Sequence, residues 1–415
     1  MERALHVSIQ TTSDKLSAMH VSQLLYLLVN IQPPKEFQQT RTSLNICLVI
    51  DRSTSMRGER LDQVKAAAAL ILEKLTPDDT LSVITFSDRA EVVVPNTPVT
   101  NRTMLMARVQ GIQASGGTEI YQGLALGMQE LAKQLGKQGL SHLVLLTDGH
   151  TYGDAGQCIE LAQRAASRNI GISALGIGTE WNDQFLDALV APSGGQSAYI
   201  EDPNRILELL QERVKGLGAA YAHNVRLTPR FPDGITVVSA FKTAPYAQPL
   251  SVIAKGISAG ALEGGATLSV LLELNIQPMS PNTTIQLPLA VVADIPQFQQ
   301  QNQEFSAFTT LDVVSGQPLS EPPMAMIEAV QVLNLYRMSE KAWQEMETGH
   351  LERATKRMER LTTRLFEAGY DQLAQNARLE TEILQKQGTI SMEGRKKLKY
   401  GTRALMTQRS LKLEE

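Results

Sequence analysis

The residues best placed for chemistry lie in one short polar segment, Asp51-Arg52-Ser53-Thr54-Ser55. A mostly apolar run, residues 44–50, precedes this segment, and Gly58 and a helical pattern follow it. This order predicts a buried parallel strand that ends in a turn and leads into a helix. Ligands of open α/β sheets bind at the carboxyl ends of such strands. We therefore expect Asp51, Ser53 and Ser55 to direct their oxygen atoms at one hard cation, Mg²⁺, Mn²⁺ or Ca²⁺.

Two later turns add oxygen ligands at the same edge of the predicted sheet. Thr118 follows Gly116-Gly117 and precedes a helical pattern, and Asp148 follows the apolar run 143–146. Crossover connections bring the carboxyl ends of parallel strands together, so both side chains should meet the first turn. The two glycines let the backbone pass close to an ion, where a Cβ would intrude. The expected metal site consists of five residues: Asp51, Ser53, Ser55, Thr118 and Asp148.

In these three turns the chain resembles the von Willebrand factor A (VWA) family and its metal-ion-dependent adhesion site, and the resemblance covers roughly residues 43–215. It implies that Ser53, Ser55 and Thr118 would bind the metal directly. Asp51 and Asp148 would act mostly through water molecules and would orient the hydroxyls. The remaining coordination position would go to water or to an Asp or Glu carboxylate of a partner protein.

Other polar residues near the turns have simpler explanations. We expect His150 at the rim of the site without a metal role, because hard cations prefer oxygen. We expect Glu119 in the first turn of a helix, where the helix dipole favours an acid. Asp88 and Asp183 are interpreted as turn and cap residues.

The resemblance favours a binding module over an enzyme. It implies an intracellular, bacterial type of protein that captures an acidic residue of a partner, such as an AAA+ ATPase or another subunit of a complex. One alternative is a hydrolase with Asp51 and Asp148 as metal ligands and a metal-bound water as nucleophile. A general base for that water could come only from Glu119 or His150. Another is a scaffold in which the metal is only structural; for the first turn taken alone, a plain helix cap is also possible.

The rest of the 415-residue chain predicts further domains. Alternating strands and helices in 43–215 indicate a doubly wound, mostly parallel, Rossmann-like VWA sheet. Residues 1–42 and 216–320 indicate the two parts of a β-sandwich into which that α/β unit is inserted. Residues 321–388 indicate a helical region, and 389–415 a basic tail whose charges face solvent or an acidic partner. The strands expected after the α/β unit are 225–228, 236–238, 251–253, 268–274 and 285–289.

The overall composition narrows the setting. The net charge is −4, so nothing global favours nucleic acid or an anionic membrane as a partner. Cys47 and Cys158, the two cysteines, are expected as buried thiols, which fits a reducing compartment. The N-terminus lacks the apolar segment of a signal peptide, and the apolar stretch 24–29 is too short to span a bilayer. We therefore expect a cytoplasmic protein.

Overall fold

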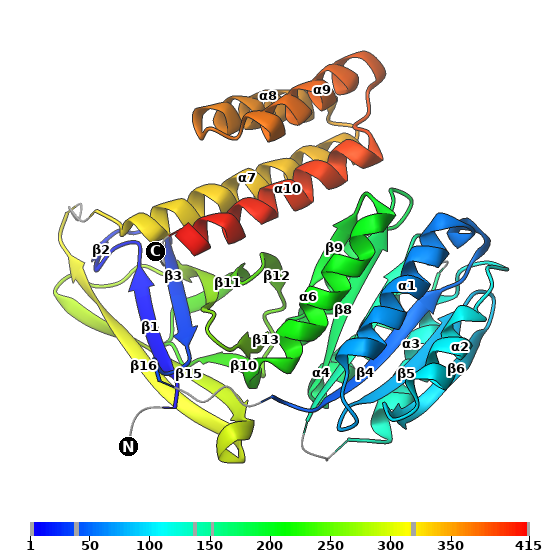
Figure 1. The fold of residues 1–415 in the computed structure, drawn as a ribbon. Coiled ribbons are helices and arrows are strands. Elements are labelled where there is room, and N and C mark those ends of the chain that lie inside the picture. Colours follow the sequence, from blue (N-terminus) through cyan, green and yellow to red (C-terminus); the bar gives the residue numbers. More distant parts are fainter. Residues whose placement is uncertain (1–3, 37–40, 136–138, 151–152, 317–320, 413–415) are drawn as a thin grey trace.

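The computed structural model describes residues 4–36, 41–135, 139–150, 153–316 and 321–412, with only the backbone of 407–412. Figure 1 shows an α/β unit, a β-sandwich beside it, and a layer of long helices above the sandwich. The α/β sheet inserted in a sandwich and followed by helices is the fold class predicted from the sequence, which is confirmed. Within the described chain, no helix combines the length and the apolar character that crossing a membrane would require.

The α/β unit has a six-stranded sheet in the order β6-β5-β4-β7-β8-β9. All neighbouring strands are parallel except β6, which pairs with β5 in the antiparallel sense and forms an edge. The two central strands are buried along almost their whole length, as continuous apolar runs predict. The strands are β4 (Leu44–Asp51), β5 (Thr80–Phe86), β6 (Ala90–Pro98), β7 (Leu140–Thr147), β8 (Ile170–Ile177) and β9 (Ser197–Ile200).

Helices cover both faces of this sheet. The core on one face includes side chains of α1, α2 and α6, and the core on the other includes side chains of α3, α4 and α5. Both faces are therefore shielded from water, and only the strand ends are left for binding. The helices are α1 (Glu59–Lys74), α2 (Arg102–Gln110), α3 (Ile120–Ala132), α4 (Ala155–Ser167), α5 (Asp183–Val190) and α6 (Ile206–Gly218), with short 3-10 turns η1 (Thr54–Met56), η2 (Ala191–Ser193) and η3 (Pro203–Arg205).

The β-sandwich is built from chain segments on both sides of the α/β unit. One sheet has the order β1-β3-β14-β11-β12 and the other β13-β10-β15-β16-β2, with a shared apolar core between them. The Thr42 amide donates to the Gly218 carbonyl at 3.1 Å, so the chain enters and leaves the α/β unit at one place. The strands are β1 (His6–Thr11), β2 (Lys15–Ser17), β3 (Gln23–Gln32), β10 (Ala220–Pro229), β11 (Ile235–Ala244), β12 (Gln248–Leu250), β13 (Ile257–Glu263), β14 (Leu268–Ile276), β15 (Thr283–Ile295) and β16 (Gln300–Val314), with the 3-10 turn η4 (Pro296–Phe298) before β16.

The expected strand at 251–253 is wrong. The neighbouring strand β12 ends at Leu250, and Ile253 forms only an isolated bridge with Gly256. Four strands of the described chain, β2, β12, β13 and β16, overlap no predicted strand. The longest of them, β16, is mostly solvent-exposed and rich in polar residues, so its hydrophobic pattern is weak.

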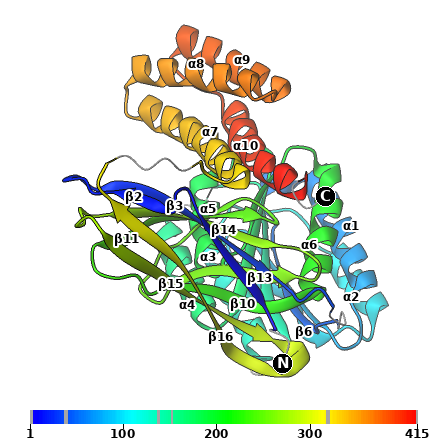
Figure 2. The ribbon, with the colours of Figure 1, turned by 90° about the vertical axis from the view of Figure 1, so that its left-hand side faces the viewer.

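The helical region contains α7 (Met324–Glu347), α8 (Leu351–Glu367), α9 (Asp371–Gln387) and α10 (Met392–Lys412). The prediction of a solvated basic tail at 389–415 is wrong for its described part, because this part forms α10, which lies alongside α7 and reaches the α/β unit (Figure 2). Lys396 and Lys399 are 0% and 1% exposed. Their charges have partners on the α/β unit, and a run of basic residues in the sequence does not reveal such partners.

Candidate metal centre

The first predicted turn is held by its own carboxylate. Asp51 is the last residue of β4 and is fully buried. Its Oδ1 accepts a hydrogen bond from the Ser53 amide at 2.8 Å, and its Oδ2 accepts one from Thr147 Oγ1 at 2.7 Å. Thr147 ends β7, the neighbouring strand. Asp51 therefore fixes the turn that carries the serines and ties it to the next strand end.

The two serines and Asp148 form a continuous row of oxygen atoms. Ser53 Oγ lies 3.0 Å from Ser55 Oγ, and Ser55 Oγ donates to Asp148 Oδ1 at 2.7 Å. The other oxygen of Asp148 accepts from Arg60 Nη1 at 2.5 Å. Thr118 is buried and lies against Gly149, the residue after Asp148. A Cβ built on Gly149 would lie 3.2 Å from Thr118 Oγ1. The structure thus brings all five predicted residues to one edge of the sheet.

Backbone hydrogen bonds hold the loop of Thr118 against the first turn. The Thr54 amide donates to the Gly116 carbonyl at 3.0 Å, and the Ser115 amide donates to the Arg52 carbonyl at 2.7 Å. Both bonds join backbone atoms, so they connect the first turn to the loop that carries Thr118 independently of the side chains.

Asp88 has a positioning role that sequence reasoning missed. Its Oδ1 accepts from the Gly117 amide at 2.8 Å, and a Cβ at Gly116 would come within 2.4 Å of its Oδ2. Gly116 also has φ 78°, which disfavours other residues. The glycines thus make room for Asp88, whereas the sequence suggested room for an ion. In the sequence, the signal for Asp88 was its position just after β5, at the same edge of the sheet as the other turns.

The site carries excess negative charge. Burial raises the pKa of Asp51 to about 6, opposed by its hydrogen bonds to Ser53 and Thr147 and assisted by the charge of Asp148. Arg60 is the only basic side chain that forms an ion pair with these two carboxylates in the described chain. All the side-chain donors converging here are oxygen atoms, which suits a hard divalent cation. The residues present therefore fit the kind of ion predicted from the sequence.

The neighbouring polar residues differ in part from expectation. His150 is exposed, and Glu119 is the N-cap residue of α3 instead of lying in its first turn. Neither side chain hydrogen-bonds to the five site residues in the described chain. The interpretation of Asp183 as only a cap residue is wrong. Asn182 caps α5, while Asp183 is buried and forms ion pairs with Arg395 and Lys399.

Family models match the α/β unit and the C-terminal helical region of the chain. Residues 45–213 match the family model of the von Willebrand factor type A domain, and residues 324–408 match that of the Sll0103-like C-terminal alpha-helical domain. The uncharacterized protein sll0103 of Synechocystis is 30% identical over 355 residues, which cover 83% of this chain and 84% of that protein. Human inter-alpha-trypsin inhibitor heavy chain H4 is 32% identical over 177 residues, 40% of this chain and 19% of that protein.

Two solved structures share the whole arrangement. A von Willebrand factor type A protein from Catenulispora acidiphila superposes with a TM-score of 0.77 at 17% identity, covering 96% of both chains. The ArnB paralog VWA2 from Sulfolobus acidocaldarius superposes with a TM-score of 0.64 at 17% identity, covering 97% of this chain and 99% of that chain. At this level of identity, the similarity concerns the fold alone.

Proposed function

This chain belongs to the family of von Willebrand factor A proteins with an Sll0103-like C-terminal helical domain, and from that premise we propose that it captures an acidic residue of a partner protein through a bound divalent cation. The observation that supports this proposal is the row of oxygen atoms from three separate turns at one sheet edge. Ser53, Ser55 and Thr118 would hold the cation directly. Asp148 would orient the Ser55 hydroxyl, with which it already shares a hydrogen bond, and Asp51 would hold the turn through the Ser53 amide.

The donor set explains why such a site would bind without cutting. Three hydroxyls are neutral, so a bound cation keeps much of its charge and attracts an anionic oxygen from outside. A partner's Asp or Glu supplies that oxygen. We propose Mg²⁺ as the resident ion, with Mn²⁺ or Ca²⁺ as alternatives, since all three take oxygen ligands. We assign no catalytic role, because neither Glu119 nor His150 hydrogen-bonds to the site residues.

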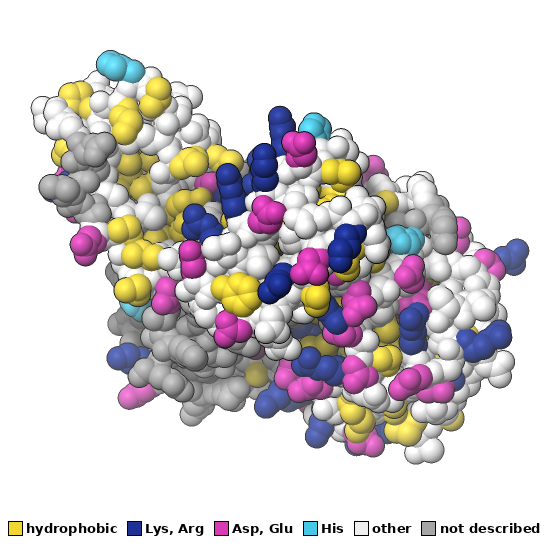
Figure 3. All heavy atoms as spheres, turned by 90° about the horizontal axis from the view of Figure 1, so that it is seen from above, with side chains coloured by type: hydrophobic (Ala, Val, Ile, Leu, Met, Phe, Trp, Pro, Cys, Tyr) yellow, Lys and Arg dark blue, Asp and Glu magenta, His cyan; other side chains and the backbone are white. Residues whose placement is uncertain are grey.

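We further propose an intracellular setting and a partner within a multi-protein complex, such as an AAA+ ATPase. Both thiols are buried, and burial raises the pKa of Cys47 to about 12, so it stays protonated and unreactive. Acidic and basic side chains are interspersed over the face seen in Figure 3. This face therefore has no uniformly negative surface that would repel an acidic partner.

A pull-down from native extract tests the proposal. The 415-residue chain should capture its partner in Mg²⁺ and release it with a chelator or with a soluble acidic peptide. The Thr118→Ala variant should fold normally but lose capture. The matched control is Thr363→Ala, which removes an exposed hydroxyl that bonds only within its own helix. Unchanged capture by Thr118→Ala, or capture that persists in chelator, would contradict the proposal and favour a scaffold role.

A further inference from the structure

A cavity far from the metal centre lies between the α/β unit and the sandwich. Its volume is about 50 Å³, and its lining comes from the starts of β7 and β8, from α6, and from the facing strands β10 and β13. This is the amino end of the parallel strands, opposite the end that carries Asp51. A single water needs roughly 10–15 Å³, whereas pockets for drug-sized ligands measure about 300–1,000 Å³. The cavity therefore has room for a few waters or one small ion.

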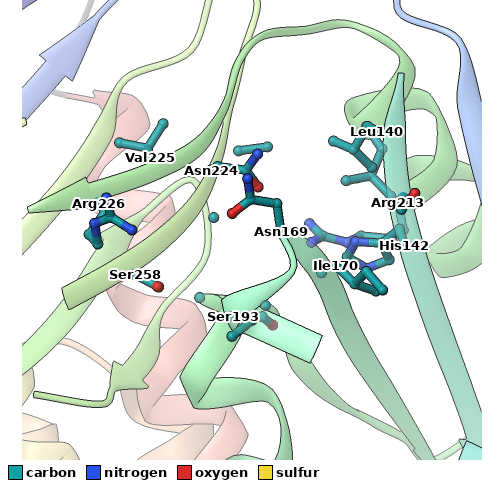
Figure 4. Close-up of a pocket in the computed structure, with 18 residues that line it drawn as sticks. Leu140, His142, Asn169, Ile170, Ser193, Arg213, Asn224, Val225, Arg226 and Ser258 are labelled. Atoms are coloured by element: carbon teal, nitrogen blue, oxygen red, sulfur yellow. The ribbon is translucent and has the colours of Figure 1, made fainter. Parts of the chain in front are cut away.

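The lining is basic. Arg213 and Arg226 line the cavity, and no lining residue of the described chain is an Asp or Glu. Figure 4 shows the two arginines at opposite sides, Arg213 on α6 and Arg226 on the sandwich. A third cation, Lys242, is fully buried near the junction and donates to the Gly194 carbonyl at 2.6 Å. The carboxylate that acts on Lys242 is Glu263, which lies beside Gly216 and outside the lining.

Arg226 has no partner among the residues that the structure describes. It forms no hydrogen bond or ion pair within the described chain, and its Nε is buried without an acceptor. Its register partner across β13 is Ser258, whose hydroxyl also has no partner there. Opposed residues of paired strands share a face, so the guanidinium and the hydroxyl face the same space. Arg226 is only partly buried, but its Nε is fully buried, and a buried N–H without an acceptor is costly unless a ligand supplies one.

The backbone around Arg226 is arranged unusually. The pairing of β10 with β15 shifts register between His223 and Arg226, and its pairing with β13 shifts immediately before Arg226. Asn224, which lies between His223 and Arg226, has φ 53°. Such bulges redirect a side chain at sites of function. Arg213, by contrast, is anchored, because its Nε donates to Ser173 Oγ at 3.0 Å. One arginine is thus fixed in place and the other is aimed at the cavity without an acceptor.

We propose that this cavity binds a small oxyanion, with inorganic phosphate as its type, between Arg226 of the sandwich and Arg213 of the α/β unit. Phosphate and sulfate accept several hydrogen bonds, and arginine matches their geometry. The volume selects a free anion over a phosphate ester. Because the two arginines come from different domains, the bound anion joins the domains and stabilises their junction.

Calorimetric titration of the 415-residue chain tests this site. Inorganic phosphate and sulfate are added at constant ionic strength, set with chloride, and a chelator removes divalent cations from the metal centre. Saturable one-to-one binding is expected, and it should persist in Thr118→Ala. Phenyl phosphate carries the same headgroup on a ring that the cavity cannot hold, so it should bind more weakly. Binding of this ester at least as tight as that of phosphate would overturn the assignment.

Two variants and a control make the result specific. Arg226→Gln should weaken phosphate at least about tenfold, as expected for the loss of a charged hydrogen bond. Ser258→Asp places a carboxylate opposite Arg226 and should abolish phosphate binding in a protein whose circular dichroism is unchanged. The control Arg230→Gln removes an exposed arginine just after β10 that pairs with Glu304, and should bind normally. No saturable binding, or equal binding in Arg226→Gln and Arg230→Gln, would refute the proposal.

Discussion

Asp51 illustrates how a binding site can oppose stability. Its carboxylate is buried, and Asp148 lies close enough to raise its pKa further. Asp51→Asn removes the buried charge while keeping an oxygen for the Ser53 amide. We therefore expect the metal-free variant to melt no lower than the wild-type protein. Mg²⁺ should stabilise the wild type by about 2.7 kcal/mol at 100 times its Kd, and the variant by almost nothing.

Differential scanning calorimetry with chelator and with Mg²⁺ measures both effects. Asp62→Asn on α1 is a suitable control, because it removes an acid from the first turn of the helix outside the oxygen row. A metal-free Asp51→Asn protein that melts several degrees lower would show that the carboxylate mainly holds the fold. A normal Mg²⁺ shift in this variant would remove Asp51 from the site.

His223 predicts how stability depends on pH. Burial lowers its pKa to about 4, against the effect of Asp294, and neither ring nitrogen has a partner in the described chain. The unfolded chain, with a histidine pKa near 6.5, binds the proton more readily than the folded one. Stability is therefore fully present above about pH 6.5 and falls as the pH drops toward 4. For this one residue the loss amounts to roughly 3 kcal/mol.

Urea unfolding at pH 7.5 and pH 5 tests this sign. His223→Leu, close in volume, should lose less stability between the two pH values than the wild type does. His20→Leu changes an exposed histidine and should leave the difference unaltered. An equal pH dependence in wild type and His223→Leu would contradict the assignment, and the likewise buried His142 would then be the next residue to vary.

Most of the candidate site could be predicted from residue types, because Ser53 and Asp148 lie in turns after apolar strands that end at one edge of the sheet. Thr118 lies in the loop between α2 and α3, and its signal was the pair of glycines before it and the helical pattern after it. The position of Asp88 after β5 placed it at this edge, but its contact could not be predicted, because that contact depends on a missing Cβ at Gly116 in a loop 28 residues later. A contact between two loops is a property of the packed structure and leaves no local pattern.

At the scale of elements, α10 is the segment that the sequence misrepresents most. A run of basic residues usually marks a solvated surface, yet Arg403 and Lys399 lie inside the molecule and share Asp187 of α5. The Asp187 carboxylate also accepts from Ser197 Oγ at 2.5 Å. Burial is possible because each charge meets an opposite one, and the partners are more than two hundred residues apart. Charge patterns alone do not contain that pairing.

Asp187→Ala should be one of the most destabilising single changes in this chain. It leaves Arg403 buried without its carboxylate partner and leaves Lys399 with Asp183 as the nearest carboxylate, and breaking one side of a buried ion pair costs about 3–5 kcal/mol. Its neighbours hold the pKa of Asp187 well below the usual range, chiefly through Arg403 against the effect of burial. The exposed pair Arg378–Glu382 provides a control, since Glu382→Ala should cost roughly 0–1 kcal/mol. Chemical denaturation measures the loss of unfolding free energy in both variants. Equal losses would count against a stabilising role for the contacts of Asp187 with α10.

At the scale of the molecule, the insertion makes the α/β unit separable in principle. Its chain ends meet at Thr42 and Gly218, and its two cores lie almost entirely within residues 44–217. Besides its contacts with the sandwich, the unit is connected to the rest through α10, where the ring centroids of Tyr400 and Trp181 lie 5.9 Å apart and Lys396 donates to the Trp181 carbonyl at 2.8 Å. In the whole chain, α10 therefore contributes to the stability of the α/β unit.

The isolated unit, residues 41–219, should fold and bind Mg²⁺ but melt at a lower temperature. Losing the cover over Trp181 removes about 2–3 kcal/mol, which lowers Tm by roughly 5–10 °C for a domain of this size. Asp187→Ala gives the sharper measurement. In the isolated unit Lys399 and Arg403 are absent, so the substitution should cost less than about 1 kcal/mol instead of 3–5. A cost as large in the isolated unit as in the full chain would mean that Asp187 acts within the α/β unit, through Ser197, and that α10 does not clamp the domains together.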